Sequence, residues 1–295
     1  MTLQRARRAG VEIAYDVEGR PADEPVLLIM GLGLQMLFWP DHFRQLLVDR
    51  GFQVARFDNR DVGLSTHLHG LGTPSPLVFV SRRWRGYRVA DMADDAVGVL
   101  DALGWSSAHV VGVSLGGMIA QTLAGLHPDR VRTLTSISST PDVRIGGAHP
   151  RLLPALLGGR GRTREGAARH VVRVFRTIGS PAYARNEPWL REMARQSFDR
   201  AHDNAGVRRQ LAAIISSPDR RPLLAGVRAP TLVVHGEADL LVRPSGGRAT
   251  AAAVAGARLV TYPGMGHDLP DALQQPIAEE IAALAARWRA ERSNP

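Results

Sequence analysis

The sequence of 295 residues contains no cysteine and no lysine. Without cysteine, the chain can form no disulfide bond, no thiolate nucleophile and no cysteine-ligated zinc or iron–sulfur site. It also lacks an apolar run of 18 or more residues, and residues 1–10 are rich in arginine without the apolar stretch of a secretory signal. We therefore expect a cytoplasmic protein without stable membrane insertion.

The sequence contains 37 arginines, and its formal net charge is +9. Many of these arginines alternate with Ala, Gly and Asp, and they form no basic stripe with interleaved aromatic residues. No nucleic-acid recognition motif accompanies them. The positive charge therefore does not indicate a nucleic-acid partner.

Apolar runs of strand length alternate along the chain with helical patterns. Such runs, joined to helices by short turns, indicate strand–helix–strand units and a parallel sheet that is covered on both faces. Residues 1–20 predict a hairpin at the sheet edge. The predicted strands cover residues 26–30, 52–57, 109–113, 131–139, 230–236 and 257–262, and the predicted helices residues 39–50, 89–103, 115–126, 245–255 and 273–291.

Two stretches depart from this alternation. Residues 66–88 predict an irregular segment that is too long for a plain connector. Residues 140–224 consist of helical pieces rich in Ala, Arg and Leu that are separated by Gly and Pro. We expect one α/β domain, formed by residues 1–139 and 225–295, with a helical insertion at 140–224, because the chain is long enough for a single large core.

The run Gly112-Val113-Ser114-Leu115-Gly116 separates a predicted strand from a predicted helix. Glycines two residues before and after Ser114 remove the side chains that would clash where a strand turns sharply into a helix. Ser114 would then project its hydroxyl from the sheet edge, next to the positive end of the helix dipole. A glycine-rich loop without a catalytic role is the alternative, but the flanking strand and helix favour a nucleophile.

A serine nucleophile needs a base that takes its proton and an acid that orients the base. On an α/β sheet the expected order along the chain is serine, acid, histidine, with the last two residues after late strands. Asp239 follows the strand at 230–236, and His267 follows the strand at 257–262. Both residues fall at carboxyl ends of parallel strands, where open α/β sheets bind their ligands.

Other residues compete for these two roles. Glu237 and Asp268 are alternative acids, although both lie off the expected position after the strand, and Asp239 could simply cap a helix. The position of His267 in a glycine-containing loop favours it as the base. Ordinary hydrogen bonds in the core or at helix ends are expected for His109, His127 and His235.

Acyl transfer also needs two hydrogen-bond donors for the developing oxyanion. The backbone N–H of Leu115, directly after the nucleophile, is one expected donor. The loop after the strand at 26–30 provides the other, and we select Leu32 because Gly31 and Gly33 allow a close approach of the backbone.

The sequence predicts no metal or nucleotide site. Gly31-x-Gly33 is a poor dinucleotide fingerprint, because position 36 is Met where the third glycine should stand. The spacing of His67 and His69 could hold a metal, but no third ligand accompanies them in the sequence. We expect these two side chains to be solvated loop histidines.

With serine, acid and histidine in this order, the chain resembles the α/β-hydrolase superfamily. Within it, the chain is similar to bacterial serine carboxylesterases of a group that includes aclacinomycin methylesterase-like proteins. The resemblance covers nearly the whole chain from Gly10 onward. Met30 departs from the His that many relatives carry, and Ser114 stands where dehalogenase and epoxide-hydrolase relatives have Asp. The motifs that carry the resemblance are Met30-Gly31-Leu32-Gly33, residues 58–68, Gly112-Val113-Ser114-Leu115-Gly116-Gly117-Met118, His235-Gly236-Glu237-Ala238-Asp239 and residues 264–270.

The resemblance implies an α/β-hydrolase fold with a mostly parallel eight-stranded sheet flanked by helices, and a helical cap at 140–224 over Ser114. It also implies ester hydrolysis through an acyl-enzyme without a cofactor. Apolar residues of the cap suggest a small-to-medium apolar carboxylic ester as substrate. The predicted substrate-binding residues are Met118, Phe175 and Trp189, although each of the two cap residues could instead merely pack the cap onto the core.

Several alternatives to ester hydrolysis stay open. The same three residues could hydrolyse a carbon–carbon or thioester bond or perform perhydrolysis, because one fold hosts several chemistries. A ligand-sensing homologue with vestigial turnover is an alternative from a different class. A small-molecule ester is the expected partner, and a homo-oligomer is compatible with the sequence.

Overall fold

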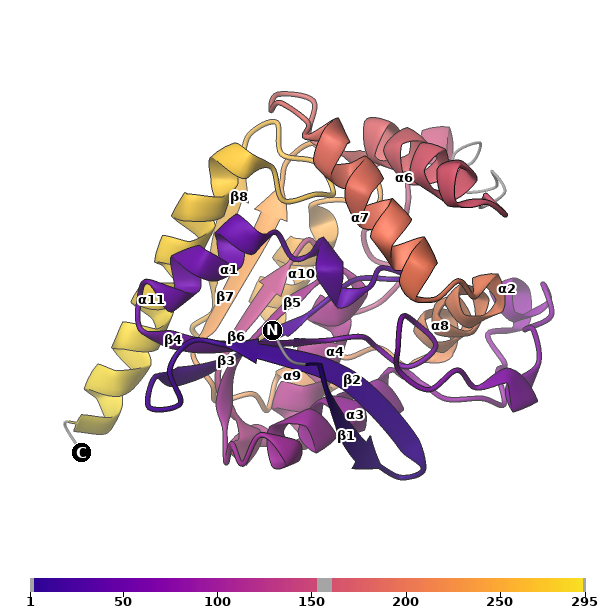
Figure 1. Ribbon diagram of the computed structural model, residues 1–295. Helices are drawn as coiled ribbons and strands as arrows, with labels where there is room; N and C mark the ends of the chain where they lie inside the picture. The colour runs from indigo at the N-terminus through magenta and orange to yellow at the C-terminus, as the bar shows by residue number, and fades with distance from the viewer. Residues whose placement is uncertain (1–2, 153–160, 294–295) are drawn as a thin grey trace.

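The computed structural model describes residues 3–152 and 161–293, and their strands form one eight-stranded sheet (Figure 1). The strands are β1 (Gln4–Arg8), β2 (Val11–Glu18), β3 (Glu24–Ile29), β4 (Phe52–Phe57), β5 (Ala108–Val113), β6 (Val131–Ile137), β7 (Thr231–Gly236) and β8 (Arg258–Tyr262). Their order in the sheet is β1-β2-β4-β3-β5-β6-β7-β8. The pairs β1–β2 and β2–β4 are antiparallel, and the other five pairs are parallel. The predicted mostly parallel eight-stranded sheet with an N-terminal hairpin at its edge is confirmed.

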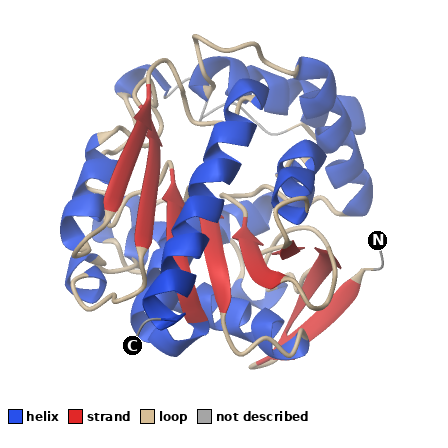
Figure 2. Cartoon of the chain, turned by 90° about the vertical axis from the view of Figure 1, so that its left-hand side faces the viewer, coloured by secondary structure: helices blue, strands red, loops and turns tan. Residues whose placement is uncertain are grey.

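Helices cover both faces of this sheet (Figures 1 and 2). The α-helices are α1 (Asp41–Val48), α2 (Val78–Ser81), α3 (Val89–Ala102), α4 (Leu115–Leu126), α6 (Arg164–Ile178), α7 (Glu187–Arg200), α8 (Asn204–Ser216), α9 (Arg221–Leu224), α10 (Ser245–Ala253) and α11 (Asp271–Ser293). Short 3₁₀ helices are η1 (Met36–Phe38), η2 (His69–Leu71), η3 (Pro128–Arg130) and η4 (Pro150–Leu152). Helices α1 and α11 pack together on one face, whereas α3, α4, α9 and α10 lie on the other. None of the described helices is both long and apolar enough to cross a membrane.

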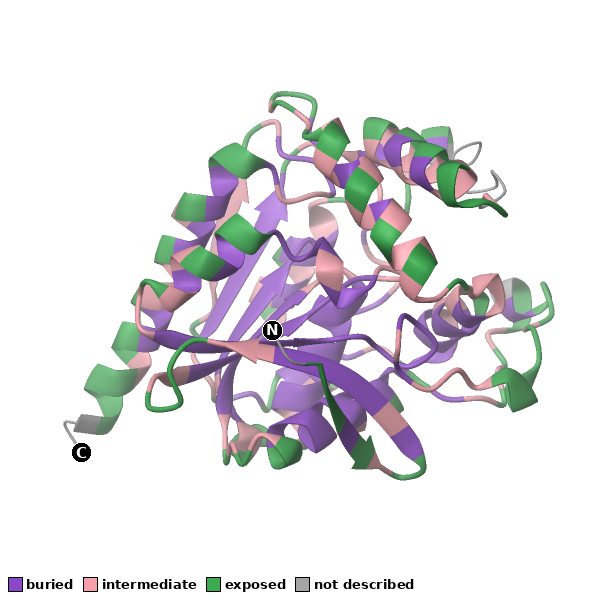
Figure 3. Cartoon of the chain, in the orientation of Figure 1, coloured by how far each residue is buried: buried purple, intermediate pink, exposed green. Residues whose placement is uncertain are grey.

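The central strands are buried on both faces, which explains their continuous apolar sequence. In β3, Leu27 and Ile29 belong to the cluster with α3 and α4, whereas Val26 and Leu28 belong to the cluster with α1 and α11. All four side chains are fully buried. Figure 3 shows the same burial along the neighbouring central strands. Alternate side chains of one strand therefore supply two hydrophobic cores.

The chain reverses its direction across the sheet at β3. Strand β4 pairs with one side of β3, and β5 pairs with the other side. Open α/β sheets bind ligands outside the carboxyl ends of the strands at such a reversal. The loop after β3 contains Leu32, and the turn after β5 contains Ser114. Both segments were predicted from sequence to contribute to the site.

Three long helices, α6, α7 and α8, lie between β6 and β7. Each helix begins after a polar side chain that accepts a hydrogen bond from a backbone N–H of the first turn, as expected for an N-cap. These side chains are Thr163, Asn186 and Asp203. Helices α6 and α7 pack against each other, and α7 also contacts η1. Residues 153–160 of the predicted insertion lie outside the described residues.

Two local expectations were wrong. The strand predicted to reach residue 139 ends at Ile137, because Ser138 has φ 45°, outside the extended region of backbone conformation. The segment 66–88, expected to be irregular, contains η2 and α2. Helix α2 packs against α8, and a helix this short depends on such tertiary contacts, which local patterns do not encode.

The junction between β5 and α4 is unusually tight. A Cβ atom at Gly112 would lie 2.0 Å from the carbonyl oxygen of Gly116, and a Cβ at Gly116 would lie 2.0 Å from the carbonyl oxygen of Ile29. Ser114, between them, has φ 57° and ψ −118°, a strained conformation for a residue with a side chain. The backbones of β3, β5 and α4 therefore approach so closely that only glycine fits at both positions.

We predict that Gly116→Ala lowers the free energy of unfolding by about 2 kcal/mol or more, because the new methyl group overpacks a backbone contact. Gly70→Ala is the matched control, since a Cβ at Gly70 has no atom within 4 Å. The control should change stability by less than about 0.5 kcal/mol. Chemical denaturation of both variants measures the difference. Equal stabilities for the two variants would contradict the tight junction.

Candidate active site

The structure brings Ser114, His267 and Asp239 together in a continuous chain of hydrogen bonds. The Nδ1 atom of His267 lies 2.7 Å from Oδ2 of Asp239, and Nε2 of His267 lies 3.0 Å from Oγ of Ser114. An ionised carboxylate only accepts hydrogen bonds, so Nδ1 carries the proton that it donates to Asp239. In the neutral ring, Nε2 is then an acceptor for the Ser114 hydroxyl. This arrangement can remove a proton from Ser114.

Backbone donors hold the carboxylate of Asp239 in place. Its Oδ1 atom accepts hydrogen bonds of 2.9 Å from the N–H groups of both Leu241 and Val242. Asp239 is only 1% exposed and His267 9%, whereas Ser114 is half-buried. Asp239 and His267 are therefore shielded from water, and the hydroxyl of Ser114 is the most accessible of the three hydrogen-bonded groups.

The two alternative acids are engaged elsewhere. Glu237 Oε1 accepts a hydrogen bond of 2.8 Å from the hydroxyl of Thr261. Asp268 Oδ1 accepts from both the backbone N–H and the hydroxyl of Ser180. Among the described residues, Asp239 is the carboxylate that hydrogen-bonds to His267.

Burial and charge oppose each other at His267. Burial lowers the pKa of its imidazole, whereas the charge of Asp239 and the hydrogen bond to Asp239 raise it. The raising effects together exceed the effect of burial, so the pKa lies above its ordinary value. A base with a raised pKa accepts a proton more readily. Asp239 therefore both orients His267 and stabilises its protonated form.

Three other histidines have the core or helix-end contacts that the sequence predicted. His235 donates from Nε2 to the carbonyl of Val242 at 2.7 Å, and His109 contacts the hydroxyl of Thr133 at 2.9 Å. Burial lowers the pKa of His109 to about 3, so this ring is neutral at pH 7. His127, next to the end of α4, donates to Asp94 at 2.8 Å.

The loop after β3 lies directly against Ser114. A Cβ built on Gly31 would lie 3.3 Å from Cβ of Ser114. Within the described residues, the backbone N–H groups of Leu32 and Leu115 have no hydrogen-bond partner. Leu115 is the first residue of α4, whose first N–H groups lack intrahelical acceptors. Both predicted donors are thus free for a ligand next to Ser114.

The predicted substrate-binding residues do not form one group. Phe175 of α6 stacks on Phe38 with ring centroids 6.5 Å apart, and Trp189 of α7 meets the same ring edge-on at 6.0 Å. Met118 is buried in the other hydrophobic cluster, on the α3 and α4 side of the sheet. Phe38 was missed in the sequence, because no local pattern links η1 with α6 and α7.

The expectation that no third partner accompanies His67 and His69 was wrong, whereas the expectation of solvated histidines holds for His69, whose side chain is exposed, but not for His67. Asp203 Oδ2 lies 3.0 Å from Nδ1 of His67 and 3.8 Å from Nδ1 of His69, and His67 is partly buried. The other ring nitrogen of His67 donates to the carbonyl of Gly63 at 2.9 Å. Arg209 donates to the same Asp203 oxygen at 2.8 Å. Because a guanidinium already pairs with this carboxylate, the cluster forms a hydrogen-bonded network between α8 and the loop after β4.

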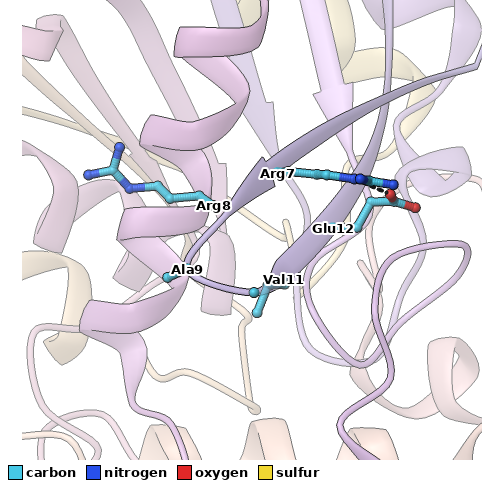
Figure 4. A pocket seen from close by; sticks show the side chains of 6 residues that line it. Arg7, Arg8, Ala9, Val11 and Glu12 are labelled. Carbon is cyan, nitrogen blue, oxygen red and sulfur yellow. Dashed lines mark hydrogen bonds and ion pairs between the residues drawn. The ribbon is translucent and has the colours of Figure 1, made fainter.

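A surface hollow at the turn between β1 and β2 lies outside the predicted site. Its lining comes from residues 7–12. Figure 4 shows Arg7 paired with Glu12, while the side chain of Arg8 points away from this pair. Arg8 is engaged with Asp101 instead. The hollow contains none of the residues predicted for the site.

Comparison with known proteins identifies related sequences. A family model described as "alpha/beta hydrolase fold" matches residues 24–271. Rhodomycin D methylesterase DauP from Streptomyces sp. (strain C5) is 32% identical over 302 residues, which cover 92% of this chain and 93% of that protein. Rhodomycin D methylesterase DnrP from Streptomyces peucetius is 32% identical with the same coverage.

Solved structures show the same architecture. The enol-lactonase from Burkholderia xenovorans LB400 superposes with a TM-score of 0.75 at 25% identity, covering 96% of this chain and 100% of that one. The esterase RhEst1 from Rhodococcus sp. ECU1013 superposes with a TM-score of 0.74 at 20% identity, covering 97% of this chain and 99% of that one. The latter likeness concerns the fold alone.

We predict that His267 titrates with a pKa above the ordinary value of a histidine, and that Asp239→Asn lowers this pKa. The variant removes the charge that favours the imidazolium, while the burial that disfavours it stays. NMR of the imidazole nitrogens across a pH series measures both values. Glu237→Gln is the control and should leave the His267 titration unchanged. A pKa that is equal in wild type and Asp239→Asn would contradict the coupling.

Proposed function

The chain belongs to the α/β-hydrolase fold family, and from this premise we propose that it is a serine carboxylesterase. The proposed reaction is hydrolysis of a small-to-medium apolar carboxylic ester through an acyl-enzyme. The hydrogen-bonded chain of Ser114, His267 and Asp239 is the observation that carries this proposal. The methylesterase relatives support a hydrolase that acts on ester bonds, which is the enzyme class expected from the sequence.

In the acylation step, Ser114 Oγ attacks the ester carbonyl while His267 Nε2 accepts the hydroxyl proton. Asp239 keeps the proton on Nδ1 and stabilises the imidazolium. The carbonyl oxygen becomes an oxyanion that accepts hydrogen bonds from the N–H groups of Leu32 and Leu115. When the tetrahedral intermediate collapses, His267 gives its proton to the leaving alcohol, and the acyl group stays on Ser114.

In the deacylation step, a water molecule takes the place of the alcohol and releases the acyl group from Ser114. His267 removes a proton from a water molecule, which attacks the acyl carbonyl. The second tetrahedral intermediate uses the same two backbone donors and releases the carboxylic acid as Ser114 recovers its proton. His267 carries every proton in these steps, from Ser114 to the alcohol and from water back to Ser114, so the proposed reaction requires no cofactor or metal.

We assign residues 1–139 and 225–295 to the catalytic core and residues 140–224 to a cap. Phe175 and Trp189, from α6 and α7, are half-buried and contact Phe38, which follows the loop proposed to bind the oxyanion. An aromatic layer beside that loop suits an apolar acyl or alcohol group. We keep Met118 as a proposed substrate-binding residue only on the ground that it lies one helical turn after Ser114, in the first part of α4.

We predict that Ser114→Ala abolishes ester hydrolysis, with a loss on the order of a millionfold as in well-studied triads. Alanine fits the turn sterically, so the fold and its circular dichroism should be preserved. Ser107→Ala is the control, since Ser107 precedes the same strand at its other end and accepts a hydrogen bond from Arg132. Comparable hydrolysis by Ser114→Ala and wild type would exclude Ser114 as the nucleophile.

If the cap shapes the substrate pocket, the rate of ester hydrolysis should depend on the length of the substrate's acyl chain. We predict that kcat/KM for p-nitrophenyl esters rises about fourfold per added methylene, from about 0.8 kcal/mol of burial each, and falls once the pocket is full. Truncating Phe175 or Trp189 to Ala should move the optimum toward longer chains. Trp288→Ala is the matched control, because Trp288 packs on His109 at the start of β5. A flat profile that neither truncation changes would contradict the cap assignment.

A further inference from the structure

Resting on the proposed esterase reaction, we propose that Gln210 of α8 is a positioning residue for the oxyanion loop. In this view, the helices between β6 and β7 do more than cover the site. One of them fixes the backbone that presents the Leu32 N–H to the substrate. The buried side-chain amide of Gln210 makes this possible, because it forms a hydrogen bond at each of its two ends.

Gln210 bridges the oxyanion loop and the loop after β4. Its Oε1 atom accepts a hydrogen bond of 2.9 Å from the N–H of Gly33, a residue 177 positions away in the sequence. Its Nε2 atom donates to the carbonyl of Arg60 at 2.8 Å. The Gln210 side chain is 0% exposed, so water does not substitute for either contact. Rotating the amide by 180° would place two donors face to face and two acceptors face to face.

The far end of this bridge is rigid. Arg60 is buried, and its guanidinium forms two hydrogen bonds with Asp95, at 2.5 and 2.7 Å. Asp95 lies in α3, within the core that packs against the sheet. The Arg60 carbonyl is therefore a fixed acceptor, and Gln210 transmits that fixed position to Gly33.

The loop is also anchored before Leu32. Asn59 Nδ2 donates to the carbonyl of Met30 at 2.9 Å, and Asn59 is buried. The N–H of Leu34 donates to the carbonyl of Gly31 at 3.3 Å and closes the turn. Leu32 thus lies between two peptides that are held by side chains from outside the loop, while its own N–H stays free of a partner among the described residues.

The consequence is a preorganised donor. Removing one oxyanion donor typically costs 10²- to 10³-fold in kcat. Losing Gln210, which only supports the Leu32 donor, should lower kcat less, on the order of tenfold, because the oxyanion loop still reaches the correct position part of the time. KM should change little, since the oxyanion exists only in the transition state.

The test compares an ester with its thionoester, in which sulfur replaces the carbonyl oxygen. Sulfur accepts hydrogen bonds weakly, so the ratio of kcat/KM between the two substrates reports on the oxyanion donors. Gln210→Met keeps a similar volume and loses both hydrogen bonds. We expect it to lower kcat for the ester about tenfold and to lower the ester-to-thionoester ratio. A smaller fraction of folded enzyme reduces both rates equally and leaves the ratio unchanged.

Gln121→Met is the matched control. Gln121 is another fully buried glutamine, and its amide contacts Ser136 at 3.0 Å and Arg220 at 3.2 Å. This variant should lose stability without changing the ratio. Gln210→Glu keeps an acceptor for the Gly33 N–H and should retain a ratio closer to wild type than Gln210→Met does. If Gln210→Met fails to fold, Gln210→Asn replaces it, since the shorter amide cannot span both contacts and should also lower the ratio.

The outcomes separate this inference from the proposed function. A wild-type ratio in folded Gln210→Met or Gln210→Asn, together with loss of activity in Ser114→Ala, would overturn the role of Gln210 alone. An equal fall of the ratio in Gln121→Met would overturn it as well, because the effect would then not be specific to the loop. Activity that survives in Ser114→Ala would instead overturn the proposed esterase mechanism.

Discussion

The close approach of α4 to β5 and β3 is the constraint on which the candidate site depends. Because Gly112 and Gly116 carry no side chains, the helix begins one residue after Ser114 and passes directly above the end of β3. This single turn forces Ser114 to φ 57° and leaves the Leu115 N–H at the start of a helix without an acceptor. It also sets the loop containing Gly31 against Ser114. The positions of the proposed nucleophile and of the proposed oxyanion donors thus follow from one steric arrangement of the backbone.

Buried polar contacts then connect α7 and α8 to the loops around this turn. Arg200 donates to Asp58 at 2.9 Å, and Arg209 donates to Asp61 at 2.7 and 2.9 Å. Burial raises the pKa of Asp58, although the charge of Arg200 opposes this effect. Such carboxylates need a paired guanidinium, because removing one partner would leave an isolated buried charge. With Gln210, these contacts make α7 and α8 part of the framework that holds the loops after β3 and β4.

Much of the fold could be predicted from sequence, because doubly buried strands and amphipathic helices have local signatures. The meeting of Ser114, Asp239 and His267 was also predictable, since the carboxyl ends of parallel strands share one edge of a sheet. Contacts made by α6, α7 and α8 were not. Phe38 beside Phe175, Asp203 beside His67 and Gln210 on Gly33 join residues far apart in sequence, and they depend on how these helices fold back onto the sheet. The same limit explains why Met118 and Phe175, both predicted to bind the substrate, lie in different clusters.

Covalent trapping is the most direct test of whether Ser114 is the nucleophile of an ester hydrolase. A fluorophosphonate reacts with an activated serine and forms an adduct that is not hydrolysed in the normal cycle. Peptide mapping by mass spectrometry after partial inactivation would locate the adduct. We expect one phosphonyl group per chain, on Ser114, with esterase activity falling in proportion to the labelled fraction of Ser114. Full labelling of Ser114 without loss of activity, or inactivation with the label on another residue, would contradict it.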